Sequence, residues 1–152
     1  MILADEADTR AAGALLAKLL RAGDVILLEG PLGAGKTTLV RGLLAALGHS
    51  GEVPSPSFAL VQPYECVSPP LWHIDLYRIE DPAELDELGL DTILSEGVLV
   101  VEWPSRAGEG AWGAGALRLS LEPQRDGGRC LTAVRGEGWE KRWPSEPSDR
   151  DR

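Results

Sequence analysis

VILLEGPLGAGKTT, residues 25–38, joins an apolar run to a glycine-rich stretch with the pattern Gly30-x4-Gly35-Lys36-Thr37. Glycines at these positions let the backbone turn its N–H groups inward around phosphate oxygens. Lys36 adds a mobile positive charge, and the Thr37 hydroxyl can ligate Mg²⁺. A helix beginning near Lys36 would point its positive dipole end at the same anion. The stretch therefore predicts a P-loop, the backbone cradle that binds nucleotide phosphates.

The residues on both sides of the loop support this interpretation. The apolar run from Val25 to Glu29 is typical of a buried parallel strand, and apolar residues recur at helical spacing from Val40 to Leu47, before Gly48. Further predicted elements are helices over 9–21 and from Asp81 to Gly89, strands over 71–76 and 97–102, and a hairpin of 117–121 with 130–134. Alternating strands and helices predict an α/β, P-loop NTPase-like three-layer sandwich with a largely parallel central sheet.

Length and composition indicate one P-loop domain over residues 1–135. The chain has 152 residues, of which 43% are hydrophobic, enough for a real core. From Gly136 onward the sequence is polar and interrupted by prolines, so residues 136–152 are expected to form a partly disordered tail. No apolar stretch approaches a membrane span, and the N-terminus is acidic where a signal peptide would be basic. These features predict a cytoplasmic protein that does not enter a membrane.

The charge of the chain argues against a direct grip on nucleic acid. The net charge is −9, and the arginines are scattered without a basic run. An acidic surface repels phosphate backbones. Any contact with RNA is therefore expected to go through a partner.

Two acidic residues are candidates to complete the site. Glu102 closes the buried run VLVVE, where a P-loop enzyme places a Mg²⁺-linked or water-orienting carboxylate; a strand-terminal acid reaching solvent is the alternative. Asp75 lies between apolar neighbours, where its charge needs a partner. It can position water or the metal, or form a structural ion pair with Arg78. His73 is a lone strand histidine, a type that more often fills a core than catalyses.

A serine-containing loop follows the P-loop helix. Ser55-Pro56-Ser57 carries hydroxyl groups on a rigid, extended segment. That is the position of a switch segment that senses the γ-phosphate. Because Ser-Pro loops are common, the loop alone is a weak indication.

Four blocks in this order resemble a known family. GPLGAGKTTLVRGLLAALG, SPSFALVQPYE, WHIDLYRIEDPAELDELGLDTIL and VLVVEWPSR are similar to the bacterial tRNA threonylcarbamoyladenosine biosynthesis ATPases of the TsaE (YjeE) family. The resemblance runs from about Asp5 to Val134. The P-loop alone is not specific to that family, whereas the HIDLYR block with VEW at this spacing is highly specific. Ser57 stands where the family usually has threonine, which keeps the hydroxyl group.

The resemblance implies an ATPase that is weak when alone and uses ATP and Mg²⁺. It implies that Thr37 and Glu102 hold Mg²⁺, that Trp103 stands beside this acid, and that Asp75 supports hydrolysis. The implied nucleotide contacts are Gly33, Ala34, Gly35, Lys36, Thr37, Thr38, Ser55 and Ser57, with Asp5 and Gly128 near the adenine. Lys36, Asp75 and Glu102 form the implied catalytic set. Family members act with TsaB and TsaD in forming N6-threonylcarbamoyladenosine (t6A) at position 37 of tRNAs that read codons beginning with A.

Two other classes of P-loop protein remain as alternatives. A small nucleotide or metabolite kinase needs a lid with clustered arginines, but residues 104–115 contain a single arginine, Arg106. A GTPase-type switch protein selects guanine with an Asn-Lys-x-Asp element, and the chain contains no asparagine. The kinase is therefore the closer alternative.

Overall fold

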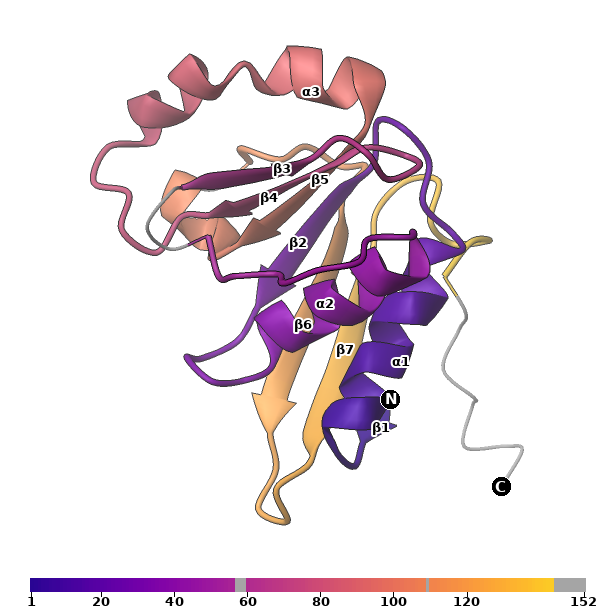
Figure 1. Ribbon diagram of the computed structural model, residues 1–152. Helices are drawn as coiled ribbons and strands as arrows, with labels where there is room; N and C mark the ends of the chain where they lie inside the picture. Colours follow the sequence, from indigo (N-terminus) through magenta and orange to yellow (C-terminus); the bar gives the residue numbers. More distant parts are fainter. Residues whose placement is uncertain (57–59, 109, 144–152) are drawn as a thin grey trace.

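The computed structural model describes residues 1–56, 60–108 and 110–143. Within these residues one seven-stranded sheet has the spatial order β1-β7-β6-β2-β5-β4-β3 (Figure 1). The strands are β1 (Ile2–Leu3), β2 (Val25–Glu29), β3 (Val61–Tyr64), β4 (Leu71–Asp75), β5 (Val98–Glu102), β6 (Leu117–Pro123) and β7 (Arg129–Arg135). Strands β6, β2, β5 and β4 pair in parallel, whereas the pairings β1–β7, β7–β6 and β3–β4 are antiparallel. The sheet has a parallel centre and antiparallel edges.

Helices cover both faces of this sheet. The helices α1 (Glu6–Ala17) and α2 (Lys36–Ala46) lie together on one face; the 3₁₀-helix η1 (Pro82–Leu88) and α3 (Leu90–Glu96) lie over the other, and the 3₁₀-helix η2 (Pro104–Ala107) follows β5 (Figure 1). Alternation along the strands supplies a core to each face. Toward α1 and α2 the central strands turn Ile26, Leu28, Val98 and Val100, and toward η1 and α3 they turn Leu27, Leu99 and Val101. The predicted three-layer α/β sandwich is confirmed.

The predicted P-loop connects β2 to α2. Its first glycine, Gly30, has φ +146°, and a Cβ there would lie 2.5 Å from the carbonyl oxygen of Leu121. A side chain at this position would therefore push the loop away from the neighbouring strand β6. Beside the loop, Asp75 and Glu102 are paired in register at the ends of β4 and β5. The parallel pairing thus brings both predicted carboxylates to the carboxyl ends of the strands, at the level where the loop begins.

Several predicted boundaries need correction. The first helix spans Glu6–Ala17 rather than 9–21, because the Asp5 side chain caps it by accepting the N–H of Asp8 at 2.9 Å. The segment after Asp81 is a 3₁₀-helix, and a separate α-helix follows Gly89. The predicted hairpin is confirmed as β6 and β7. The two-residue strand β1 was not predicted, since it is too short to show periodicity.

The predicted polar tail also needs correction for residues 136–143. Trp139 is 1% exposed and Trp143 is 5% exposed, and both belong to the core beneath α1 and α2. Arg142 stacks on Trp139 at 3.9 Å from the ring centroid and forms an ion pair with Asp24 at 2.6 Å. Two buried aromatic rings outweigh the polar composition of this segment. Residues 144–152 lie outside the described part of the chain.

Candidate nucleotide-binding site

A cleft of about 510 Å³ opens at the carboxyl ends of β2, β4 and β5. Its volume is within the range of small-molecule sites. The cleft brings together most of the predicted site residues, namely Asp5, Gly33, Ala34, Gly35, Lys36, Thr37, Thr38, Ser55, Asp75 and Glu102. Gly128 does not line the cleft, although its neighbours Gly127 and Arg129 do. Ser57 lies outside the described residues.

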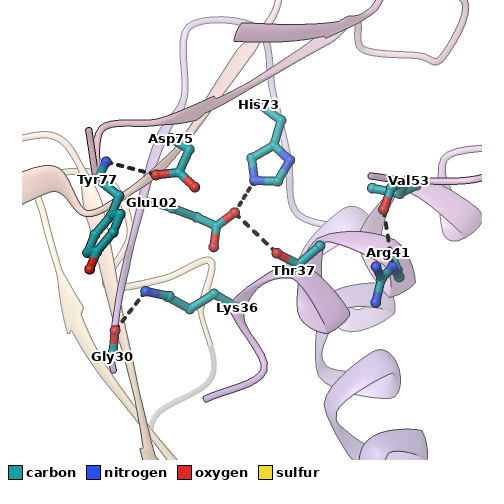
Figure 2. A network of polar contacts seen from close by, with 9 residues as sticks. All are labelled: Gly30, Lys36, Thr37, Arg41, Val53, His73, Asp75, Tyr77 and Glu102. Atoms are coloured by element: carbon teal, nitrogen blue, oxygen red, sulfur yellow. Dashed lines mark hydrogen bonds and ion pairs between the residues drawn. The ribbon is translucent and has the colours of Figure 1, made fainter. Parts of the chain in front are cut away.

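Lys36 is folded back into the loop. It is 5% exposed, and its Nζ donates a hydrogen bond to the Gly30 carbonyl oxygen at 2.7 Å (Figure 2). The same Nζ lies 3.6 Å from the centroid of the Trp103 ring. Burial lowers the pKa of Lys36, while the charges of Glu102 and Asp75 oppose that shift. A phosphate in the cleft would offer this partly desolvated ammonium group a stronger partner than a carbonyl oxygen and a ring.

Glu102 is held by two side chains. It is 3% exposed, and its Oε2 accepts a hydrogen bond from His73 Nε2 at 2.6 Å and one from the Thr37 hydroxyl at 3.4 Å (Figure 2). His73 is fully buried. The sequence alone indicates a core residue at His73, and the structure adds a contact of this buried ring with Glu102. The alternation of β4 places His73 and Asp75 on the same face, which is the signal that could have revealed this contact.

Thr37 and Glu102 fit the oxygen chemistry of Mg²⁺. Both offer hard oxygen ligands, and the ion usually takes one or two carboxylates together with water and phosphate oxygens. Within the described residues, no group of three or more His, Cys, Asp and Glu side chains could hold a metal ion. The pair is therefore suited to an ion that arrives with a nucleotide rather than to one bound by the protein alone.

Asp75 occupies the matching position on β4 but has different surroundings. It is 6% exposed, and its Oδ1 accepts the backbone N–H of Tyr77 at 2.8 Å. Burial raises the pKa of Asp75, and the nearby charge of Glu102 adds to the shift. The Tyr77 hydrogen bond and the positive charges near the carboxylate act in the opposite direction. A carboxyl group in a cleft whose pKa is raised is suited to orient or deprotonate water.

Two arginines in the cleft were missed by the sequence analysis. Arg41 lies one helical turn after Thr37, and its Nε donates to the Val53 carbonyl oxygen at 3.2 Å, which ties α2 to the segment before Ser55. The spacing of four residues from Thr37 could have revealed it. Arg129 reaches the P-loop from β7 and donates from Nε to the Ala34 carbonyl oxygen at 2.8 Å. No local pattern marks this second contact.

The fold and the cleft together define a class, the α/β proteins with a P-loop-like fold and a cleft at the carboxyl ends of the parallel strands. Comparison with known proteins narrows this class. The family described as threonylcarbamoyl adenosine biosynthesis protein TsaE matches residues 3–131. The chain belongs to the TsaE family.

Individual relatives agree with this assignment. A protein of Streptomyces coelicolor named tRNA threonylcarbamoyladenosine biosynthesis protein TsaE is 50% identical over 97 residues, which cover 62% of the chain and 66% of that protein. A protein of Mycobacterium leprae with the same name is 46% identical over 105 residues, covering 63% of the chain and 65% of that protein. The chain thus spans about two thirds of the length of these relatives. The crystal structure of Bacillus subtilis YdiB has a TM-score of 0.77 and 31% identity, and covers 93% of this chain and 88% of its own.

No helix among the described residues is long and apolar enough to cross a membrane.

Proposed function

We propose that the chain is a Mg²⁺-dependent ATPase that supports t6A formation on tRNA together with the TsaB and TsaD proteins. The observation that carries this proposal is the convergence of Lys36, Thr37 and Glu102 at one end of the cleft. The family description and the names of the relatives connect such proteins with threonylcarbamoyladenosine biosynthesis. The two partner proteins are inferred from the family resemblance of the sequence.

In this proposal each residue has a defined task. Backbone N–H groups of residues 33–38 bind phosphate oxygens, apart from that of Ala34, which donates to the Pro31 carbonyl oxygen at 3.1 Å, and Lys36 leaves the Gly30 carbonyl for the β- and γ-phosphates. Thr37 and Glu102 hold Mg²⁺, which would neutralise charge on the phosphates. Asp75 orients the attacking water. Ser55, which also lines the cleft, responds to the γ-phosphate.

Hydrolysis by the chain alone is proposed to be weak. An arginine finger stabilises the charge of the transition state in many P-loop enzymes. Arg41 and Arg129 line the cleft, but the Nε of each is bound to a backbone carbonyl oxygen. Neither is therefore poised as a mobile finger. A partner that supplies or frees such a charge would accelerate turnover.

The adenine contact proposed for Asp5 and Gly128 is supported only by the position of these residues at or next to the cleft. Asp5 lines the cleft, although one of its oxygens is committed to capping α1. Gly128 stands next to two residues that line the cleft. We keep both as proposed neighbours of the nucleoside.

A small kinase is the runner-up function, and the surroundings of Arg106 argue against it. A kinase closes a lid with several arginines over two phosphorylated substrates. Here Arg106 is the only arginine of residues 104–115, and its guanidinium lies 5.5 Å from the centroid of the Tyr77 ring. Water as the acceptor therefore agrees better with a segment that carries a single arginine than a second phosphorylated substrate does.

A retention experiment tests the proposed pathway. The chain is immobilised and exposed to bacterial extract with ATP, with ADP or without nucleotide, and the retained proteins are identified by mass spectrometry. Recovery of TsaB and TsaD homologues in a nucleotide-dependent manner is the expected result. Because the chain carries a net charge of −9, we expect tRNA to be retained only when those proteins are retained. If neither TsaB nor TsaD is retained with ATP, with ADP or without nucleotide, the proposal is contradicted.

A further inference from the structure

Arg129, the first residue of β7, contacts the P-loop from outside the loop. Its Nε donates to the Ala34 carbonyl oxygen at 2.8 Å, and its Nη2 donates to the Gly33 carbonyl oxygen at 3.0 Å. Its Nη1 donates to the carbonyl oxygens of Gly127 and Gly128, at 3.1 and 3.0 Å. One guanidinium group thus joins two P-loop carbonyls to two carbonyls of the β6–β7 turn.

Binding these two P-loop carbonyls fixes the direction of two N–H groups. A trans peptide is planar, and its C=O and N–H point to opposite sides. Because Arg129 holds the Gly33 carbonyl, the N–H of Ala34 points away from Arg129, where it donates to the Pro31 carbonyl oxygen at 3.1 Å and closes the loop. Because Arg129 holds the Ala34 carbonyl, the N–H of Gly35 also points away from Arg129. The N–H of Ala34 is thus engaged within the loop, and the N–H of Gly35 is held in a fixed direction.

The P-loop needs such external support because of its composition. Gly33 and Gly35 have φ of +77° and +101°, the left-handed region that glycine adopts freely. Glycine also loses the most conformational entropy when it is ordered, so holding the loop in one arrangement is costly without contacts from outside the loop. A group that holds the binding arrangement before the ligand arrives lowers the cost of binding.

The turn that carries Arg129 is itself well fixed. The N–H of Gln124 donates to the Gly128 carbonyl oxygen at 2.8 Å, and the N–H of Gly128 donates to Asp126 Oδ1 at 2.9 Å. A Cβ on Gly128 would lie 2.8 Å from the Leu3 carbonyl oxygen, so the turn packs closely against the N-terminal segment. Arg129 therefore extends from a rigid base.

We propose that Arg129 is a positioning residue that holds the P-loop in its phosphate-binding arrangement before the nucleotide binds. The proposal rests on the proposed nucleotide-binding function of the cleft. It assigns the effect to the fork geometry of the guanidinium group, which binds several carbonyls at once, rather than to the positive charge. A lysine has one nitrogen and cannot reproduce this set of contacts.

Three variants test the proposal: Arg129→Ala, Arg129→Lys and, as a matched control, Arg135→Ala. Arg135 lies on the same strand and donates to the carbonyl oxygens of Glu140 and Trp143, away from the P-loop. Affinity is measured by titration with a fluorescent ADP analogue and Mg²⁺, and turnover by phosphate release at saturating ATP. Amide hydrogen exchange of residues 31–36 is followed without nucleotide, so this measurement does not depend on the proposed ATPase activity.

Both Arg129 variants should weaken ADP binding about tenfold or more, while turnover at saturating ATP changes little. Both should also speed amide exchange in residues 31–36. Arg135→Ala should lower thermal stability but leave affinity and loop exchange as in the unaltered protein. If Arg129→Ala does not fold, Arg129→Lys carries the test alone.

Two results would overturn the inference: affinity and loop exchange of Arg129→Ala equal to those of the unaltered protein, or full affinity in Arg129→Lys, which would assign the effect to charge. Failure of the unaltered protein to bind the analogue would instead contradict the proposed function, and the exchange measurement would still decide the role of Arg129.

Discussion

The ends of β4 and β5 carry carboxylates at the same level of the sheet, yet their surroundings differ. Asp75 and Glu102 are paired in register, and both are almost fully buried. Glu102 receives hydrogen bonds from two side chains, His73 and Thr37, which come from β4 and α2. Asp75 receives the backbone N–H of Tyr77, and burial raises its pKa. Burial of an acid is thus compensated differently at two adjacent strand ends.

This difference indicates a division of labour. A carboxylate fixed by two neighbouring side chains keeps its orientation, as a metal ligand must. A carboxyl group whose pKa is raised is closer to accepting a proton, as a residue that handles water must be. We therefore propose that Glu102 binds the ion and that Asp75 orients water.

The largest effect is expected for Glu102→Gln. Loss of the charged ligand should reduce ATP hydrolysis by roughly 10² to 10³-fold, the range seen when one transition-state contact is removed. Nucleotide should still bind, but its affinity should no longer depend on Mg²⁺. Phosphate release and nucleotide titration with and without a chelator measure the two properties. Glu29→Gln is the control, because Glu29 also ends a central strand but forms an ion pair with Arg118.

Asp75→Asn should have a smaller effect on hydrolysis, roughly 10 to 10²-fold, since it removes an orienting group rather than the ion. In contrast to Glu102→Gln, this variant should keep the Mg²⁺ dependence of nucleotide affinity. The same titrations with and without a chelator give the comparison. The same Mg²⁺ dependence of nucleotide affinity in Asp75→Asn and Glu102→Gln would show that the two carboxylates do not have separate roles.

His73→Phe tests whether the hydrogen bond between His73 and Glu102 contributes to hydrolysis. An aromatic ring remains at this position, but the hydrogen bond to Glu102 Oε2 is lost. We expect hydrolysis to fall about tenfold through misplacement of the carboxylate, and a higher Mg²⁺ concentration to be needed for half-maximal rate. His73→Gln, which can still donate, should be less affected. An unchanged Mg²⁺ requirement in His73→Phe would reduce His73 to a core residue.

The smallest effect concerns stability against pH. Burial raises the pKa of Asp75, so between its ordinary value and its raised value the folded protein binds more protons than the unfolded chain. The free energy of unfolding contributed by Asp75 therefore falls as pH rises through this window. Asp75→Asn should lack that fall. Urea unfolding of both proteins over the acidic range, without nucleotide, measures the difference, and parallel curves would contradict the raised pKa.

The sequence predicts the parts of the site whose residues are close in the chain. Gly30, Gly35, Lys36 and Thr37 follow a spacing that backbone geometry itself requires, and the structure places them between the end of β2 and the first residues of α2. Their binding of phosphate stays a prediction. Glu102 is placed by the apolar run before it. The pairing of two such strands then brings Asp75 beside Glu102.

Contacts between distant segments are what the sequence does not reveal. His73 and Glu102 are 29 residues apart, and Arg129 lies 95 residues after Ala34. Such contacts depend on strand order and register. The alternation of β4 indicates the face on which His73 lies but not its partner, and no local pattern marks the contact of Arg129. Composition also fails to reveal the burial of Trp139. The residues around it are mostly polar, so the segment reads as a polar tail, although the Trp139 ring is buried.

The central claim is that the cleft binds nucleotide through Lys36 with the help of Mg²⁺. Calorimetric titration with a non-hydrolysable ATP analogue, with Mg²⁺ and with a chelator, tests this claim most directly when the unaltered protein and Lys36→Ala are compared. We expect one nucleotide bound per chain, weaker binding without Mg²⁺, and a loss of affinity of at least about tenfold in Lys36→Ala. Equal binding by both proteins, or no binding by the unaltered protein, would contradict this claim.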